Sequence, residues 1–287
     1  MPELPEVETV VRQLARVLPG RRIRSLEVFH PDLLREPVPS FRSALVGREI
    51  RAVGRRGKNI VLSLSRHHVL AVNLGMTGRL LYQGPGREAG DQGEGSLPHS
   101  QPPLTHLAVR FLLEPDGWLN YADVRRFGSI RRFTLQGWET ESRRLGPEPL
   151  APSLTADSFH SRLRASRSPI RSWLLDQTRI AGIGNIYAVE ALFNAGIHPQ
   201  TPACSLDQER ARTLLGALRD VLRRAIEARG TTLRDYRTAT GQEGGFAGSL
   251  QAYGKAGEPC PRCKTIIERL VFANRSAFLC PRCQRKP

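Results

Sequence analysis

Four cysteines near the C-terminus form two Cys-x-x-Cys pairs, Cys260 with Cys263 and Cys280 with Cys283. A two-residue spacing lets both thiolates of a pair face one ion, and four thiolates complete a tetrahedral zinc site. The 16 residues between the pairs fall within the range typical of zinc ribbons. Because thiolates fill all four coordination positions, the sequence predicts one structural Zn²⁺ ion with no open position for catalysis.

The segment between the pairs predicts a β-hairpin, with strands at Ile266–Val271 and Ala277–Leu279. It is too short to build its own core, so we expect the metal to hold it. Cysteines spread along a secreted chain would favour disulfides, whereas this clustering indicates metal in a reducing compartment. Five cations give the predicted finger a phosphate-binding surface: Arg262, Lys264, Arg269, Arg275 and Arg282.

The charge of the chain indicates a polyanionic partner. Lysine and arginine total 43 against 27 acids, a net charge of +16. Nucleic acid is the leading partner, and a bias toward solubility is the alternative. The start MPELPEVETV is unlike a signal peptide, and no stretch approaches the ~18 apolar residues of a membrane span. We expect a cytoplasmic protein without a membrane partner, associated with the nucleoid in a bacterium-like cell.

The first half of the chain predicts a β-sandwich. A helix is expected at Val7–Leu18, and the Pro-x-x-Pro start before it is not expected to begin a helix. A stretch rich in Gly, Pro and Ser at 84–103 predicts a surface loop. Short apolar or alternating runs predict the strands Ile23–Val28, Ile50–Val53, Ile60–Leu64, Val69–Leu74, Leu107–Leu113 and Trp118–Tyr121.

After Gly146 the apolar spacing becomes helical. It predicts helices at Ser153–Arg164, Ile170–Leu175, Ile186–Ala195, Leu206–Ala228 and Leu233–Tyr236. We therefore expect an α+β multidomain chain: a catalytic sandwich over residues 1–137, a helical DNA-binding domain over 138–243, and a linker with the zinc finger over 244–287.

The N-terminus carries a chemically unusual residue. Once Met1 is removed, Pro2 presents a secondary amine. An α-amino group titrates at about pH 8 and lysine at about 10.4, so a far larger fraction of the former is neutral. A neutral amine can attack the C1′ carbon of a sugar and form an iminium, an electron sink for strand cleavage. Glu3 can donate or relay protons. Taken alone, an extended arm with incidental acids is the simpler interpretation.

Several motifs occur together in one order along the whole chain: MPELPEVETV, LGMTGRL, DVRRFG, LGPEPL, AGIGNIYAVEALFNAGIHP, GGFAGSLQAYGKAGEPC and the four-cysteine finger. This combination resembles the formamidopyrimidine-DNA glycosylase family, also called 8-oxoguanine DNA glycosylase/AP lyase. Leu4 stands where the sister group resembling endonuclease VIII typically has glycine. The resemblance implies a β-sandwich, a helix–two-turn–helix domain and a β-hairpin zinc finger.

The resemblance also implies an activity, a partner and catalytic residues. The chain would be a monomer that excises oxidised purines from double-stranded DNA through a Schiff base and cleaves the strand at abasic sites by β,δ-elimination. Pro2 would be the nucleophile and Glu3 the acid, with Glu6 as a supporting carboxylate. Lys58 would bind the phosphate near the lesion and assist β-elimination. Arg275 would grip phosphates and donate the proton for δ-elimination.

Other positions would contact the DNA. Met76 and Phe127 would fill the gap left by the flipped base, Arg125 would pair with the orphaned cytosine, and Asn185 would bind phosphate. The tight turns around Met76 and Phe127 favour exposure, although such residues are more often core. Lys58 as a solvated residue and Asn185 as a helix cap are the plainer alternatives. His106 matches a DNA-contacting histidine, with a structural role equally open.

Three positions depart from the family pattern. Asn73 replaces a common histidine, Arg234 a common lysine, and Ser166 a common basic residue, although Arg164, Arg167 and Arg171 flank it and can supply charge for DNA. Two other functions stay open: an architectural DNA-binding zinc protein that has lost catalysis, and a zinc-ribbon RNA-binding protein. Intact Pro2, Glu3 and Lys58 argue against the first. The second explains the charge and the finger but not the N-terminus or the DVRRFG turn.

Overall fold

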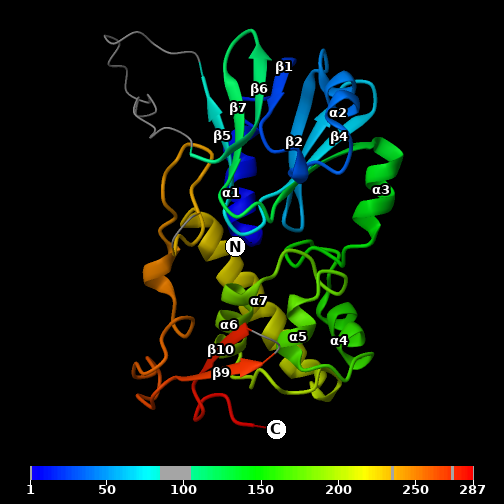
Figure 1. Cartoon of the computed structure of the whole chain (residues 1–287). Coiled ribbons are helices and arrows are strands. Elements are labelled where there is room, and N and C mark those ends of the chain that lie inside the picture. Colours follow the sequence, from blue (N-terminus) through cyan, green and yellow to red (C-terminus); the bar gives the residue numbers. More distant parts are fainter. Residues whose placement is uncertain (1, 85–104, 234–235, 273–274, 287) are drawn as a thin grey trace. The chain divides into compact units, whose positions relative to one another are not determined.

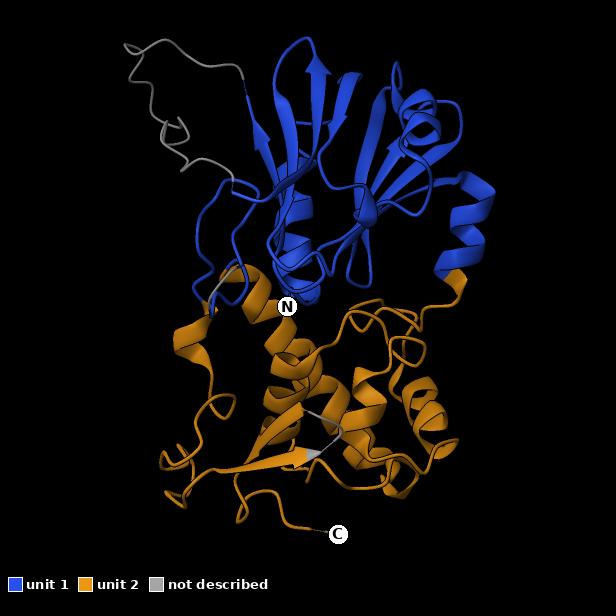
Figure 2. Ribbon diagram, viewed as in Figure 1, with its two compact units in different colours: residues 1–142, 229–245 blue, residues 143–228, 246–287 orange. Residues whose placement is uncertain are grey.

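The computed structural model describes residues 2–84, 105–233, 236–272 and 275–286 (Figure 1). The predicted loop at 84–103 lies outside these ranges except for Gly84, and so does Arg234. The chain divides into two compact units (Figure 2). Unit 1 contains residues 1–142 and 229–245, and unit 2 contains residues 143–228 and 246–287. The three-domain boundaries expected from the sequence stay a prediction.

Unit 1 is built on two four-stranded sheets with the orders β1-β6-β7-β5 and β2-β3-β4-β8, which confirms the predicted sandwich. Alternate side chains point inward, as Leu70 and Val72 do on β4. The strands are β1 Arg22–Val28, β2 Ile50–Arg56, β3 Asn59–Leu64, β4 His68–Asn73, β5 Gly78–Gln83, β6 Leu107–Glu114, β7 Trp118–Asp123 and β8 Ser129–Thr134.

The first helix, α1 (Leu4–Leu14), begins earlier than expected. The expectation that the Pro-x-x-Pro start would not begin a helix was wrong. Pro5 lies in the first turn, where a backbone N–H has no helical partner and proline costs nothing. Glu3 caps the helix in a capping box with Glu6. The helix ends at Leu14 instead of Leu18, and α1 packs against β2 and β3.

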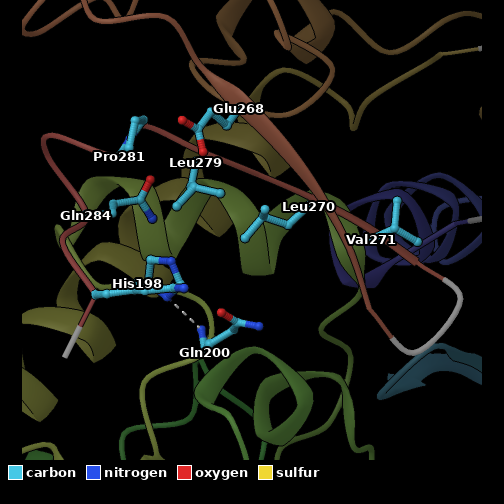
Figure 3. Close-up of a pocket in the computed structure, with 9 residues that line it drawn as sticks. His198, Gln200, Glu268, Leu270, Val271, Leu279, Pro281 and Gln284 are labelled. Atoms are coloured by element: carbon cyan, nitrogen blue, oxygen red, sulfur yellow. Dashed lines mark hydrogen bonds between the residues drawn. The ribbon is translucent and has the colours of Figure 1, made fainter.

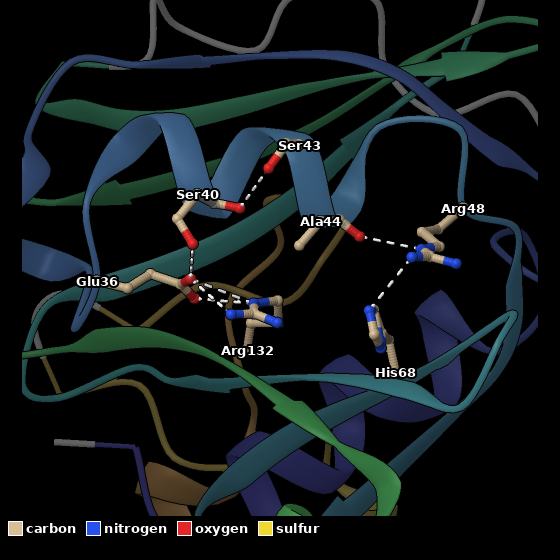
Figure 4. Close-up of polar contacts among 7 residues, drawn as sticks. All are labelled: Glu36, Ser40, Ser43, Ala44, Arg48, His68 and Arg132. Carbon is tan, nitrogen blue, oxygen red and sulfur yellow. Dashed lines mark hydrogen bonds and ion pairs between the residues drawn. The ribbon is translucent and has the colours of Figure 1, made fainter.

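The sequence interpretation missed β5, β8 and the helices α2 (Val38–Leu45) and α3 (Leu135–Arg143). The sequence of β8 is polar because it contains two adjacent arginines, Arg131 and Arg132. Arg132 nevertheless lies on the same face as buried Leu70 opposite it, and Glu36 accepts a 2.9 Å hydrogen bond from its guanidinium (Figure 4). A tertiary ion pair thus offsets the cost of turning a charge inward.

Residues 229–245 leave the helical part of the chain and pack with the sandwich. The backbone N–H of Ala239 donates to Gln13 Oε1 on α1 at 2.8 Å, and the buried Tyr236 hydroxyl donates to the carbonyl of Glu6 at 3.3 Å. The predicted helix at Leu233–Tyr236 includes two residues outside the described ranges.

Unit 2 contains the helices α4 (Ala156–Arg164), α5 (Ile170–Leu175), α6 (Asn185–Asn194) and α7 (Gln208–Glu227). All four were predicted, and α5 has the predicted bounds. α6 is buried on nearly every side because α5, α7 and β10 all contact it. β9 (Glu268–Phe272) and β10 (Arg275–Leu279) form the antiparallel hairpin of the finger. Among the helices that the structure describes, none combines the length and apolar character needed to cross a bilayer.

Candidate functional site

The N-terminal segment is buried at the start of α1. Pro2 is buried and Glu3 is 2% exposed. Glu6 accepts a 2.8 Å hydrogen bond from the backbone N–H of Glu3 and one of 2.7 Å from the N–H of Thr231. This carboxylate therefore ties the predicted nucleophile segment to residues 229–245. The supporting role of Glu6 and the catalytic roles of Pro2 and Glu3 stay predictions.

Lys58 lies half-buried in the turn between β2 and β3. Arg55, at the end of β2, donates to Glu8 on α1 at 2.9 Å and to the carbonyl of Gly57 at 3.0 Å. Burial opposes ionisation of Glu8, but hydrogen bonds from Arg12 and Arg55 outweigh it and lower its pKa. Glu8 is thus ionised at neutral pH, and this ion pair holds the Lys58 turn against the first turns of α1.

Met76 and Phe127 occupy two turns and are 37% and 62% exposed, as the tight turns predicted. The guanidinium carbon of Arg125 lies 4.9 Å from the centre of the Phe127 ring. That contact is typical of a cation–π pair and limits the freedom of both side chains. The three residues predicted to enter the DNA stack therefore project from neighbouring turns of the same unit.

A buried carboxylate that the sequence interpretation missed connects these turns. Asp123, at the end of β7, is 1% exposed and accepts hydrogen bonds from the Thr77 hydroxyl at 2.6 Å and the Gly128 N–H at 2.8 Å. Thr77 in turn accepts from the N–H of Arg125 at 3.0 Å. The Tyr121 hydroxyl lies 3.3 Å from the same carboxylate, and burial followed by Asp123 raises the pKa of that tyrosine. The signal available in the sequence was the acid at the start of DVRRFG.

The backbones of the two turns touch at Gly75. Its φ is +56°, and a Cβ there would collide with the backbone of Phe127 and Gly128. Asn73, which departs from the family pattern, accepts a 3.0 Å hydrogen bond from the N–H of Gly75 and donates to Asn59 Oδ1 at 3.0 Å. Its amide therefore supports the Met76 turn from within the protein.

In unit 2, Asn185 is the first residue of α6, and Gly184 is its N-cap, so the capping alternative for Asn185 was wrong. Asn185 Nδ2 donates to the carbonyl of Ser276 on β10 at 2.9 Å. Arg171 was expected to offer charge to DNA, but it is 1% exposed and donates to both Asn185 Oδ1 and the Ser276 carbonyl. Arg275, next to Ser276, is exposed.

Two further residues predicted to contact DNA, His106 and Arg167, are exposed. His106 lies in a turn at φ +62°, and its carbonyl accepts from the N–H of Asp123. Arg167 is exposed between α4 and α5. Ser166 is 7% exposed and accepts from the N–H of Ser168 at 3.2 Å, so it supports the loop from inside and cannot replace a basic surface residue.

The sulfur atoms of the four cysteines lie within 4.8 Å of one another. The Cys260–Cys283 and Cys263–Cys280 sulfur separations are 4.0 and 3.4 Å. Zinc–sulfur bonds of about 2.3 Å in a tetrahedron require sulfur separations of about 3.8 Å. Cys260 and Cys280 are also buried in an apolar cluster with Val189 and other side chains of unit 2. The donor set and its spacing fit one structural zinc ion.

Three family descriptions match consecutive parts of the chain. The formamidopyrimidine-DNA glycosylase N-terminal domain matches residues 1–130, the H2TH domain of the same glycosylase matches residues 145–237, and the zinc finger found in FPG and IleRS matches residues 257–285. The fold and site define a DNA glycosylase of the class that combines a sandwich, an H2TH domain and a zinc finger. The chain belongs to the formamidopyrimidine-DNA glycosylase family, and its finger holds one structural zinc ion.

Relatives match over the full length. The formamidopyrimidine-DNA glycosylase of Thermomicrobium roseum is 46% identical and covers 99% of both chains, and that of Chloroflexus aurantiacus is 42% identical over 99% of this chain and 98% of its own. A Lactococcus lactis FPG mutant in complex with Fapy-dG DNA is 32% identical with a TM-score of 0.87, covering 99% of this chain and all of the other. The Lactococcus lactis Fpg in complex with DNA that contains an abasic site is 31% identical, with a TM-score of 0.86. These matches confirm the resemblance to the family.

Proposed function

We propose that this chain is a bifunctional DNA glycosylase and AP lyase. It excises 8-oxoguanine and formamidopyrimidines from duplex DNA and then cleaves the strand by β,δ-elimination. The observation that carries the proposal is the position of Pro2 beside the buried Glu3 carboxyl, at the start of a helix that also holds the Lys58 turn. A secondary amine, an acid and a cation in one unit are the groups that this chemistry requires.

The reaction begins with attack of the Pro2 nitrogen on C1′ of the damaged nucleotide. The N–C1′ bond forms as the glycosidic bond breaks, and the departing base takes the electron pair and a proton. Glu3 supplies a proton and assists opening of the sugar ring. As the Pro2 nitrogen releases its own proton, the C1′–O4′ bond breaks, O4′ takes a proton and a charged iminium forms between that nitrogen and C1′. The iminium withdraws electrons, so loss of a C2′ proton expels the 3′ phosphate. Loss of the C4′ proton then expels the 5′ phosphate, and water releases Pro2.

The cations act on the phosphates. Lys58 binds the phosphate near the lesion and assists the first elimination, while Arg275 donates the proton for the second. Asn185 and Arg167 bind the backbone of the same strand, as does His106. Zinc supplies no chemistry at the reacting carbon; it holds the hairpin that carries Arg275.

Met76 and Phe127 enter the stack after the base is flipped out, and Arg125 hydrogen-bonds the orphaned cytosine. Flipping costs a few kcal/mol, roughly the energy that inserted side chains can return. The exposure of both turns supports this role. The bound DNA in the Lactococcus lactis complexes, containing Fapy-dG or an abasic site, supports a duplex as the substrate here. The net charge of +16 agrees with a DNA partner. We further propose that the enzyme acts as a monomer.

Borohydride trapping on a duplex that contains 8-oxoguanine tests the nucleophile. The chain starting at Pro2 should form a covalent complex, and Pro2→Gly should retain reduced trapping because a primary amine remains. A short extension ahead of Pro2 converts the amine into an amide and should abolish trapping. Affinity for a duplex with a tetrahydrofuran abasic analogue reports whether the extension spares DNA binding. Full trapping by the extended chain would show that another amine is the nucleophile, and no trapping by any form would favour an architectural DNA-binding protein.

A further inference from the structure

Arg171 on α5 connects a helix to the zinc-bearing hairpin from a buried position. One guanidinium nitrogen, Nη2, donates to Asn185 Oδ1 at 2.7 Å and to the carbonyl oxygen of Ser276 at 3.0 Å. Asn185 Nδ2 donates to the same carbonyl at 2.9 Å. Three elements, α5, α6 and β10, therefore meet at one backbone oxygen.

Ser276 directly follows Arg275 in β10, so any movement of its carbonyl moves Arg275. The Ser276 hydroxyl also accepts a 2.9 Å hydrogen bond from Arg269 on β9, which joins the two strands beside the same point. Hydrogen bonds from a charged donor are stronger than bonds between neutral groups. These bonds therefore hold the hairpin firmly at Ser276, directly after Arg275, the predicted phosphate ligand.

One side of the hairpin lines a pocket. Glu268, Leu270 and Leu279 of the hairpin border a cavity of about 490 Å³. The buried His198 lies on the other side of that cavity, with its Nδ1 accepting from the N–H of Gln200 at 3.2 Å (Figure 3). The hairpin is therefore held by its polar contacts at Ser276 together with apolar contacts such as those of Phe278 on its other face.

Besides Arg171 on α5, a buried group on α6 holds the segment that leads into the finger. The carboxylate of Glu190, 1% exposed, accepts hydrogen bonds of 2.8–3.0 Å from three successive N–H groups, those of Gln251, Ala252 and Tyr253. The Tyr253 ring packs against Phe278 of β10, with 5.2 Å between centroids. α6 thus fixes both the linker and the hairpin, and the Arg171 contact is the one adjacent to Arg275.

We propose that Arg171 is a positioning residue for DNA binding: it holds the Ser276 carbonyl and the Asn185 amide so that Arg275 and Asn185 meet the same stretch of phosphates. Direct contact between Arg171 and DNA is excluded by its 1% exposure. The inference rests on the proposed function, because it assigns the phosphate contacts to Arg275 and Asn185. It explains why a cation predicted to lie at the DNA surface is buried.

A double-mutant cycle tests the proposal with the zinc-loaded full chain and a duplex that contains a tetrahydrofuran abasic analogue. Arg171→Met should weaken binding about tenfold in the otherwise unchanged protein. In an Arg275→Ala background, Arg171→Met should weaken binding by a factor at least about threefold smaller, because the side chain that Arg171 positions is gone. Arg171→Lys, which keeps three charged donors, should recover most of the affinity. Arg212→Met, an exposed position on α7, removes the same charge and should change the affinity less than about twofold.

Equal losses in the two backgrounds would overturn the proposal, as would an unchanged affinity for Arg171→Met. If the Met variant does not fold, as judged by zinc content and melting temperature, Arg171→Gln enters the same cycle with a polar group in the same place. A second readout is the ratio of β- to δ-elimination products on an abasic duplex at saturating enzyme, which should shift toward β-elimination. The binding cycle uses uncleavable DNA, so its outcome is independent of whether Pro2 proves to be the nucleophile.

Discussion

The Thr77 hydroxyl donates a 2.6 Å hydrogen bond to the carboxylate of Asp123 and thereby joins the turn that carries Met76 to the turn that carries Phe127. The N–H of Gly128 donates to the same carboxylate. Thr77 lies 46 residues from Asp123 in the sequence, and Gly128 lies five residues from it. The two exposed side chains predicted to enter the DNA stack thus depend on one buried acid. A change at this acid should alter both together.

Asp123→Asn should reduce both stability and base excision. An amide nitrogen cannot accept the bonds that one carboxylate oxygen now accepts, so at least one buried donor is left unpaired at a cost of about 1–3 kcal/mol. We expect a lower free energy of unfolding by about 2 kcal/mol in urea denaturation. Excision from an 8-oxoguanine duplex should fall by more than about tenfold, while cleavage at a preformed abasic site changes less. Asp220→Asn, an exposed acid on α7, is the control; equal effects of the two variants would contradict the connecting role of Asp123.

Glu3→Gln should remove base excision and largely spare the cleavage of abasic DNA. The substitution keeps the shape of a buried side chain but removes its proton, and general acid catalysis contributes about 10²–10⁴-fold. The single-turnover rate on an 8-oxoguanine duplex should fall more than about 100-fold. The rate on an abasic duplex should fall less than about tenfold. Glu209→Gln, an exposed acid on α7, should match the unchanged protein. Equal losses on both substrates would show that Glu3 acts in the elimination steps as well.

Cys263→Ser, or removal of zinc, should unfold the finger and leave the rest of the chain folded. Cys260 and Cys280 share their apolar cluster with Val189 and Phe193 of α6, but the hairpin has too few apolar side chains to hold without metal. Far-UV circular dichroism should change little, while affinity for lesion DNA drops by about 100-fold or more because Arg275 is no longer held. Cys204→Ser, at the cysteine outside the cluster, should retain zinc and affinity. Normal binding by metal-free protein would show that the finger does not contribute.

The histidine at the start of β4 should make the stability of unit 1 depend on pH. His68 Nε2 accepts a 3.3 Å hydrogen bond from Arg48, which also donates to the carbonyl of Ala44 on α2 (Figure 4). Burial, followed by the charges of Arg48, Arg132 and His67, lowers the pKa of His68 below its ordinary 6.5. Glu36, paired with Arg132, is the acid on the neighbouring segment.

The folded state therefore binds fewer protons at this site than the unfolded chain. The contribution of His68 to stability is complete above pH 6.5 and is lost as pH falls from there through the lowered pKa. We expect the melting temperature to drop between pH 7.5 and 5.5, and His68→Gln to make that drop smaller. His160→Gln on α4 serves as the comparison. An unchanged pH dependence for the His68 variant would show that protonation occurs elsewhere.

The sequence alone predicted the features that depend on residues close together in the chain. The zinc site was predictable because each Cys-x-x-Cys pair lies in one tight turn, and only the meeting of the two pairs needed tertiary structure. Strands such as β3 and β4 are visible locally as short apolar runs, and α5 shows its helical spacing within six residues. The chemistry proposed for Pro2 follows from the sequence, because removal of Met1 would leave a secondary amine next to an acid.

Tertiary structure alone decided which polar groups are buried and what they hold. Arg171 looked like one more surface cation, but its acceptor on Ser276 lies 105 residues away. Asp123 looked like a turn residue, but its partner Thr77 lies 46 residues away, in the turn before β5. Residues 229–245 follow the helices in sequence yet pack with the sandwich. A buried charge is tolerated only where distant segments supply its hydrogen bonds, and no local pattern of residues records which segments those will be.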